Sequence, residues 1–325
     1  MQRDRAPVTY GSGAFFWTMK PFRTIQEQVA LLQSRGLVVD DTAEAERFLL
    51  FENYYNVVNG YKELFYKAGG TDVFEEGTTF GELVATFKFD AGLRGLFLPQ
   101  LLHIENNIKT LVAYVFSRNH GETAYMDANN FDYSEDNKEG VNSLIGVFSS
   151  TIRNGGKTPM IDHYLREHDG KIPLWVLVDI LTFGNISFFY RYMKQKDKND
   201  VARQYKIQPD ILGRYLRNLD MARNCCAHGE RFFNIRFRTR ISAPPELAGL
   251  GLHPDKARHF PCGQDDLFSV LLMIKRLSRD NDAFICFATA LSNAVKDIRQ
   301  NVKGDVMGKM LCQMGFPANW EEAIR

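Results

Sequence analysis

Three polar side chains fall close together in the run Arg223-Asn224-x-x-x-His228. A histidine changes its charge near neutral pH, so it can take up and release a proton during a reaction. An arginine presents a planar set of donors that binds phosphate oxygens and stabilises negative charge as it develops. Together these side chains could assist the attack of a ribose 2′-hydroxyl on the adjacent phosphate, which requires no metal. We therefore take Arg223, Asn224 and His228 as candidate catalytic residues for RNA cleavage and expect no metal or cofactor.

The spacing of this motif is a weak signal on its own. In a chain with this content of arginine and histidine, chance alone gives about 0.5 such pairs. The plainer alternative is a histidine at the C-terminal end of a helix, where it interacts with the helix dipole, surrounded by arginines that only solvate the surface. Support for chemistry must therefore come from the surrounding sequence.

The segment 203–240 around the motif is strongly basic. It holds eight arginines and one lysine against three acidic residues, in a chain whose formal net charge is only +1. A local patch of this kind points to phosphate as the partner. Phe232, Phe233 and Phe237 alternate with arginines, so we expect these rings to stack on unpaired bases. The candidate RNA-binding residues that arise from this patch are Arg217, Arg236 and Arg238.

The motif is expected to lie on a helix that runs from Pro209 to His228. Proline suits the first position of a helix, and Gly229 permits the helix to end beside the histidine. At about 100° per residue the apolar positions make one buried stripe. These positions are Leu212, Tyr215, Leu216, Leu219, Ala222 and Cys226. Asn224 and His228 fall on the nearly opposite face, so they are expected to point away from this helix's core.

The whole chain is predicted to be all-α, with residues 1–19 as a flexible leader and residues 20–325 as a single helical domain. Apolar spacing and capping signals, such as Thr24 followed by Glu27, predict four helices before the motif and a peripheral helix between residues 132 and 156. The four predicted helices span residues 25–35, 42–55, 87–119 and 174–194. After the motif, residues 239–266 are expected to be an irregular connector. The remainder, residues 267–325, is predicted to hold two helices, which begin at residues 265 and 280, and a short tail.

Composition excludes several classes of protein. Five cysteines, odd in number and without the spacing of a zinc site, favour a reduced cytoplasmic chain. The apolar run 14–17 is too short for the core of a signal peptide. The weakly charged stretch 172–190 carries Asp179, so we expect a buried helix with Trp175 and Phe183 in the core rather than a membrane partner.

Several separate segments resemble the abortive-infection AbiD/AbiF group, an Abi-like branch of the HEPN superfamily. The run from Ala222 to Asn234, which contains the motif, carries the strongest resemblance. Other segments agree in order and spacing, and the resemblance covers residues 20–320. These segments are Lys20-Pro21-Phe22, Asn53-Tyr54-Tyr55 through Gly60-Tyr61, His103-Ile104-Glu105, Leu174-Trp175-Val176, Leu181-Thr182-Phe183-Gly184 and Met314-Gly315-Phe316-Pro317.

The resemblance implies a HEPN-type helical bundle in which two motifs, one from each protomer of a homodimer, form a metal-independent ribonuclease site. Such a protein would act as a toxin in antiviral defence, held back by a restraining RNA or protein until phage infection. The family's functional pattern carries over to the motif, and Arg231 and Asn234 match family positions that support RNA or the motif itself. Lys109 stands where the family more often has arginine, which leaves its role open.

Two alternatives to an enzyme stay open. A non-catalytic RNA-binding protein would hold a structured non-coding RNA on the same basic surface, and a purely protein-binding helical module is the third hypothesis. Glu105 could assist catalysis, but a salt bridge to Lys109, four residues later on a helix, is the expected role. Cys225 is not expected to be a nucleophile, because nothing in the sequence points to an oxyanion site.

Overall fold

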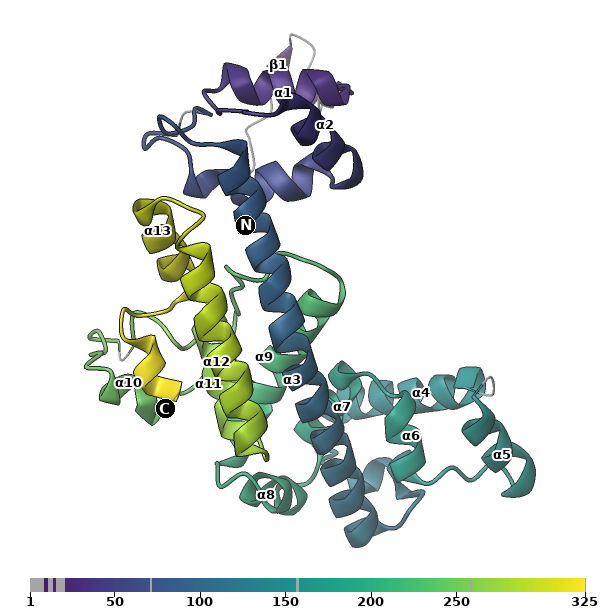
Figure 1. The fold of residues 1–325 in the computed structure, drawn as a ribbon. Coiled ribbons are helices and arrows are strands. Elements are labelled where there is room, and N and C mark those ends of the chain that lie inside the picture. Colours follow the sequence, from purple (N-terminus) through teal and green to yellow (C-terminus); the bar gives the residue numbers. More distant parts are fainter. Residues whose placement is uncertain are drawn as a thin grey trace. The chain divides into compact units, whose positions relative to one another are not determined.

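A computed structural model of the chain describes residues 9–10, 14–15, 21–70, 72–155, 158–257 and 259–324. The all-α prediction is confirmed, since helices and the loops between them make up nearly all of these residues (Figure 1). Most of the leader predicted for residues 1–19 lies outside the described residues. Within it, strands β1 (Thr9–Tyr10) and β2 (Ala14–Phe15) form one short antiparallel pairing.

The chain divides into two compact units, Met1–Val84 and Ala85–Arg325, and the boundary falls inside helix α3 (Phe80–His120). A single domain over residues 20–325 stays a prediction.

The first unit is built around helices α1 (Ile25–Ser34) and α2 (Thr42–Phe51), which pack against each other. The capping box predicted for Thr24 is confirmed: its hydroxyl accepts a hydrogen bond from the N–H of Glu27, and its own N–H donates to the Glu27 carboxylate at 2.7 Å. Helix α2 ends at Phe51 rather than near residue 55. The chain continues in a π-helical turn, η1 (Tyr55–Asn59), and a 3₁₀ turn, η2 (Lys62–Leu64).

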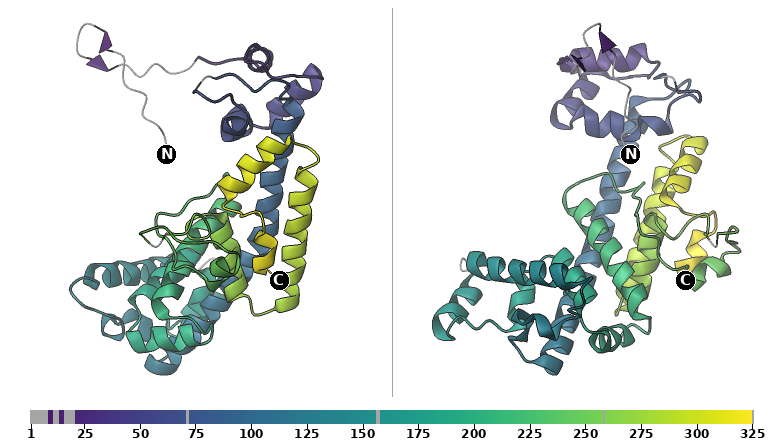
Figure 2. Two further views of the ribbon diagram at one scale, coloured as in Figure 1. Left: turned by 90° about the vertical axis from the view of Figure 1, so that its left-hand side faces the viewer. Right: turned by 180° about the vertical axis from the view of Figure 1, so that it is seen from behind.

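Helix α3 carries the apolar face that the sequence predicts. Its buried residues in the second unit recur at steps of three and four and include Leu93, Phe97, Leu101, Ile104, Ile108, Val112 and Val115. The ring of Phe97 contacts Phe232, in the segment after the motif, with centroids 5.1 Å apart. On its other side it contacts Phe287 of helix α12 (Asn281–Ile298) at 5.0 Å. Helices α3 and α12 accordingly run side by side in every view (Figures 1 and 2).

The helix predicted over residues 174–194 is wrong as a single element. The structure has two helices here, α6 (Leu174–Ile180) and α7 (Phe183–Tyr192). Thr182 and Asn185 form a capping box that starts α7, so side chains take the hydrogen bonds that a continuous helix would have made. Phe183 is buried as predicted, whereas Trp175 is 51% exposed and does not belong to the core.

Helix α4 (Lys138–Gly155) lies within the predicted peripheral segment and packs against α5 (Pro159–Glu167), α6 and α7. The 3₁₀ turns η3 (Ala124–Met126) and η4 (Ala128–Asn130) precede it. Helix α8 (Gln195–Arg203) follows α7. Helices α5 and α8 were not predicted, because each has 9 residues, fewer than the window of about 11–18 residues over which helical periodicity is recognised.

Helix α9 (Pro209–Ala227) agrees with the predicted motif helix to within one residue and packs against α7, α8 and α11 (Leu267–Leu277). The connector 239–266 is irregular, as predicted, apart from the short helix α10 (Pro245–Gly249). Beyond α11 and α12, the predicted tail contains a further helix, α13 (Gly304–Met314), and a 3₁₀ turn, η5 (Trp320–Ile324).

Candidate active site

Helix α9 buries the predicted apolar stripe and ends beside the motif histidine. Asn224 is half-buried and His228 is exposed, as expected for the face opposite the stripe. His228 is the C-cap, and its backbone N–H donates to the carbonyl of Asn224 at 2.9 Å. Gly229 follows with a φ of 70°, and the N–H of Glu230 donates to the carbonyl of Cys225 at 3.0 Å. Together with the bond from the N–H of Gly229 to the carbonyl of Cys226 at 3.3 Å, the bond from Glu230 makes a Schellman motif, which stops the helix at a fixed point and so fixes the histidine at its end.

A row of charged and polar side chains joins α3 to α9. The Glu105 carboxylate, 3% exposed on α3, pairs with Lys109 Nζ at 2.9 Å and with Arg223 Nε at 3.0 Å. Arg223 also donates from Nη1 to Asn224 Oδ1 at 3.3 Å, and Asn224 Nδ2 donates to Asp220 Oδ1 at 3.1 Å. The predicted salt bridge from Glu105 to Lys109 is confirmed. Glu105 additionally holds the motif arginine, so a carboxylate on one helix orients the guanidinium of another.

Arg223, Asn224 and His228 line one cavity of about 500 Å³. The Ile180-to-Gly184 junction between α6 and α7 forms the facing wall. The lining residues are Glu105, Lys109, Asp179, Ile180, Leu181, Thr182, Gly184, Asp220, Arg223, Asn224 and His228. The three motif residues predicted from the sequence are thus brought together around one space, with Arg223 and His228 contributed by the same chain.

Asp220 sits in this lining one helical turn before Asn224. Burial raises the pKa of its carboxyl above the ordinary value, an effect that the hydrogen bond from Asn224 partly opposes. From the sequence, Asp220 was recognised only as one of three acidic charges in the basic segment. Its position four residues before Asn224, on the same face of the helix, was the signal that could have identified it.

The segment after the motif folds into the core rather than outward. Phe232 and Phe233 are fully buried and Phe237 is 5% exposed, so the prediction that these rings stack on unpaired bases is wrong. The cause is Asp90 on α3, which is itself fully buried. Its carboxylate accepts the backbone N–H groups of Phe232 and Phe233 at distances down to 2.6 Å. These bonds satisfy the two buried donors and draw the segment against α3.

The candidate RNA-binding residues lie in two places. Arg217 projects from the middle of α9 and lines a second cavity, which adjoins that of the motif. Arg231, Arg236 and Arg238 are exposed on the segment after the motif and line neither cavity. Asn234 is half-buried on the same segment. The structure therefore groups Arg217 with the motif and sets the other four candidates apart.

Cys225 is a core residue and not a candidate nucleophile. Burial, followed by the charges of Glu230 and Asp90, raises the pKa of its thiol to about 12, so the thiol stays protonated at neutral pH. Its Sγ donates to the backbone carbonyl of Arg231 at 3.5 Å. All five cysteines are unpaired.

The part of the chain that the structure describes offers neither a metal site of clustered ligands nor a membrane span. No group of three or more His, Cys, Asp or Glu in this part of the chain is placed to hold a metal ion. In the same residues, no helix has both the length and the apolar character required to cross a membrane.

Comparison with known proteins identifies the family. A family model described as Abi-like protein matches residues 47–234, which is more than half of the chain and ends at Asn234, directly after the motif. Searches among curated proteins and among solved structures gave no match. The matched region includes Glu105, Lys109 and every residue that lines the motif cavity. The chain belongs to the family of Abi-like proteins.

Proposed function

We propose that this protein is a metal-independent HEPN-type endoribonuclease that acts in abortive infection. Membership of the Abi-like family supports the role in abortive infection. The observation that carries the enzymatic part is the single cavity lined by Arg223 and His228, with Arg223 anchored by buried Glu105. A positioned arginine beside an accessible histidine is the pair of groups that phosphodiester cleavage requires.

In the proposed reaction the ribose 2′-hydroxyl attacks the adjacent phosphorus and the bond to the 5′-oxygen of the next nucleotide breaks. His228 takes up the proton of the attacking 2′-hydroxyl, and the protonated His228 or a solvent water gives a proton to the leaving 5′-oxygen. Arg223 stabilises the charge that builds on the phosphoryl oxygens, and Asn224 holds the guanidinium in place through its hydrogen bond. The products are a 2′,3′-cyclic phosphate and a 5′-hydroxyl, so atoms and charge balance without a co-reactant.

A homodimer would bring two such motifs together in a composite site. The outer face of α9 supports this arrangement, because Arg217, Met221 and His228 are exposed at steps of one and two turns with half-buried Asn224 between them. We further propose a cytoplasmic protein that a restraining RNA or protein holds inactive until infection. Five unpaired cysteines are compatible with that compartment.

The second candidate is a non-catalytic protein that holds a structured non-coding RNA. The observation in its favour is that Arg231, Arg236 and Arg238 are exposed outside the motif cavity, where they could contact phosphates without taking part in chemistry. In this case Arg223 and His228 would serve as phosphate contacts only.

The deciding experiment is cleavage of mixed cellular RNA in EDTA by the wild-type protein and by His228→Ala. Arg299→Gln is the matched surface control, because Arg299 is exposed on the C-cap of α12 and lines neither cavity. We expect the wild type and the control to cleave and His228→Ala to lose activity while it keeps its oligomeric state. Equal cleavage by all three proteins would reveal a contaminant, and tight RNA binding without cleavage would support the second candidate.

A further inference from the structure

A second cavity, of about 640 Å³, lies between α7 and α9 and adjoins the motif cavity. The two cavities share Gly184, at the start of α7, and Asp220 on α9. The two helices approach closely at this point, because a Cβ added to Gly184 would lie 3.2 Å from an oxygen of Asp220. A ligand in the second cavity would therefore lie directly beside one in the motif cavity.

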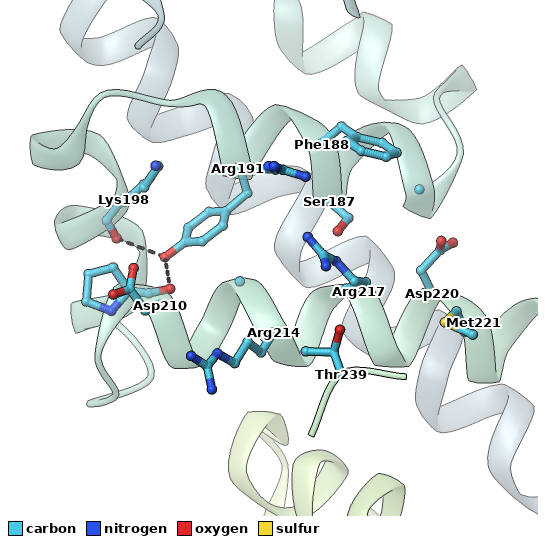
Figure 3. Close-up of a pocket in the computed structure, with 14 residues that line it drawn as sticks. Ser187, Phe188, Arg191, Lys198, Asp210, Arg214, Arg217, Asp220, Met221 and Thr239 are labelled. Carbon is cyan, nitrogen blue, oxygen red and sulfur yellow. Dashed lines mark hydrogen bonds between the residues drawn. The ribbon is translucent and has the colours of Figure 1, made fainter. Parts of the chain in front are cut away.

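The second cavity carries an excess of positive charge. Arg191, Lys198, Arg214 and Arg217 line it against two acids, Asp210 and Asp220. Arg191 and Arg217 both point into the space between the helices, from opposite sides (Figure 3). Among the described residues, Arg214 and Arg217 make no ion pair. Unpaired guanidinium groups around a concave space favour an anionic ligand with several acceptor oxygens.

Lys198 adds a partly desolvated cation to this wall. Burial lowers the pKa of its ammonium group, although Asp132 and Asp210 oppose the effect. Beside it the Tyr190 hydroxyl donates to the backbone carbonyls of Pro209 at 3.0 Å and of Lys198 at 3.4 Å (Figure 3). These bonds fix one end of the cavity, so its shape is set before a ligand arrives.

The cavity also offers apolar surface at its rim. Phe188 on α7 is 50% exposed and Met221 on α9 is 43% exposed, and both side chains line the space. The ring of Phe188 is held by Tyr192, with centroids 6.3 Å apart and planes nearly parallel. An exposed, pre-positioned aromatic ring beside arginines is the combination on which an unpaired base stacks while its phosphate is bound.

We propose that this cavity binds one nucleotide of single-stranded RNA, next to the phosphate that occupies the motif cavity. The base stacks on Phe188 and the phosphate is bound by Arg214 and Arg217. The cavity's volume is within the range of about 300–1,000 Å³ found for small-ligand sites. A space of this size has no room for a duplex, so a base must be unpaired to enter it. This proposal rests on the proposed function, since it places the unpaired nucleotide beside the phosphate that reacts.

The test is binding of a short, fluorescently labelled, single-stranded 2′-O-methyl RNA. This probe lacks the attacking hydroxyl, so binding is measured without cleavage and independently of whether the protein is an enzyme. The proteins are the wild type, Phe188→Ala, Phe188→Tyr, the double variant Arg214→Gln/Arg217→Gln, and Arg299→Gln as the control. Circular dichroism melts of each variant verify that the chain stays folded.

We expect Phe188→Ala to weaken binding by about 5- to 100-fold and Phe188→Tyr to retain it, because the ring supplies the stacking surface. The double variant should reduce the slope of log affinity against log salt by about 0.7 to 1.4, as one or two phosphate contacts disappear. Arg299→Gln should behave as the wild type.

Unchanged binding by Phe188→Ala would overturn the nucleotide pocket even if the arginine variant weakened binding, since a phosphate contact alone would then remain. Equal affinity for duplex RNA would also overturn it, because a paired base cannot enter the cavity. These results are separate from failure of the proposed function, which would appear as unimpaired cleavage by His228→Ala whatever the pocket variants bind.

Discussion

At the scale of single residues, Glu105 connects two helices that line the motif cavity. One buried carboxylate neutralises Lys109 of its own helix and orients Arg223 of another. Two cations that share one anion depend on it unequally. If Glu105 is replaced, the buried Lys109 loses its ion-pair partner. Arg223 is more exposed and retains its hydrogen bond to Asn224.

Replacing Glu105 by Gln should therefore destabilise the fold by about 3–5 kcal/mol, because the buried Lys109 ammonium is left without a counter-charge. The free energy of unfolding in urea measures this loss. The double variant Glu105→Gln/Lys109→Met should regain most of the stability, since no charge is then left unpaired. RNA cleavage should remain impaired in both variants, because Arg223 loses the carboxylate that orients it in each. Full activity in the stabilised double variant would contradict the positioning role of Glu105.

The sequence was most informative where chemistry depends on neighbours along one helix. The placement of Asn224 and His228 opposite the stripe centred on Leu219 followed from helical geometry alone. The contact of Glu105 with Arg223 could not be predicted in this way, because it joins residues 118 apart on two helices. Phe232 and Phe233 were predicted to stack on RNA bases because they alternate with arginines. They are buried instead, because their backbone N–H groups bind Asp90, which is 142 and 143 residues away in the sequence.

At the scale of elements, helix capping explains which helix ends could be predicted from the sequence and which could not. The end of α9 was predictable, since Gly229 follows the histidine and only its φ of 70° completes the Schellman motif. The break between α6 and α7 was missed, although Gly184-Asn185 interrupts the sequence just after it, because apolar residues continue on both sides. Helix α13 was missed as well, as part of the predicted tail.

Helix α11 carries a cap with a measurable pH dependence. Its N-cap, Asp266, is buried and accepts hydrogen bonds from the N–H groups of Gly263 and Ser269. Burial nevertheless raises the pKa of its carboxyl from 3.8 to about 6, and the two hydrogen bonds oppose the shift. A carboxyl whose pKa is higher in the folded state binds more protons there, so its contribution to stability is present below about pH 4 and is lost as pH rises through 6.

The free energy of unfolding should therefore fall by about 3 kcal/mol from this group between about pH 4 and pH 6. Asp266→Asn keeps a capping oxygen and removes the titration, so its unfolding free energy should lack this fall. Urea titrations of both proteins at several pH values measure the difference. Parallel curves for the two proteins would contradict a raised pKa at this carboxyl.

At the scale of the whole molecule, the question is whether one chain or two complete the site. Arg223 and His228 line the same cavity within a protomer, yet the exposed face of α9 would also bring motifs together across a dimer. Mixing two inactive variants distinguishes these arrangements. If the reacting pair comes from two protomers, Arg223→Ala and His228→Ala should complement each other.

In an equal mixture that exchanges freely, half of the dimers are mixed and each has one intact composite site, so about a quarter of the wild-type rate should return. Cleavage of RNA in EDTA measures it, with each variant alone as the control. No recovery, once exchange has been verified by differently tagged subunits, would mean that each protomer works with its own Arg223 and His228.

The long separation between Glu105 and Arg223 also has a consequence during synthesis. A ribosome adds about 5–20 residues per second, so the arginine emerges about 6–24 s after the carboxylate that will hold it. During this interval the nascent chain contains Glu105 on α3 but does not yet contain the motif that this carboxylate will hold. The proposed nuclease activity therefore arises only after most of the polypeptide has been made, and a translation product that stops short of α9 lacks the motif.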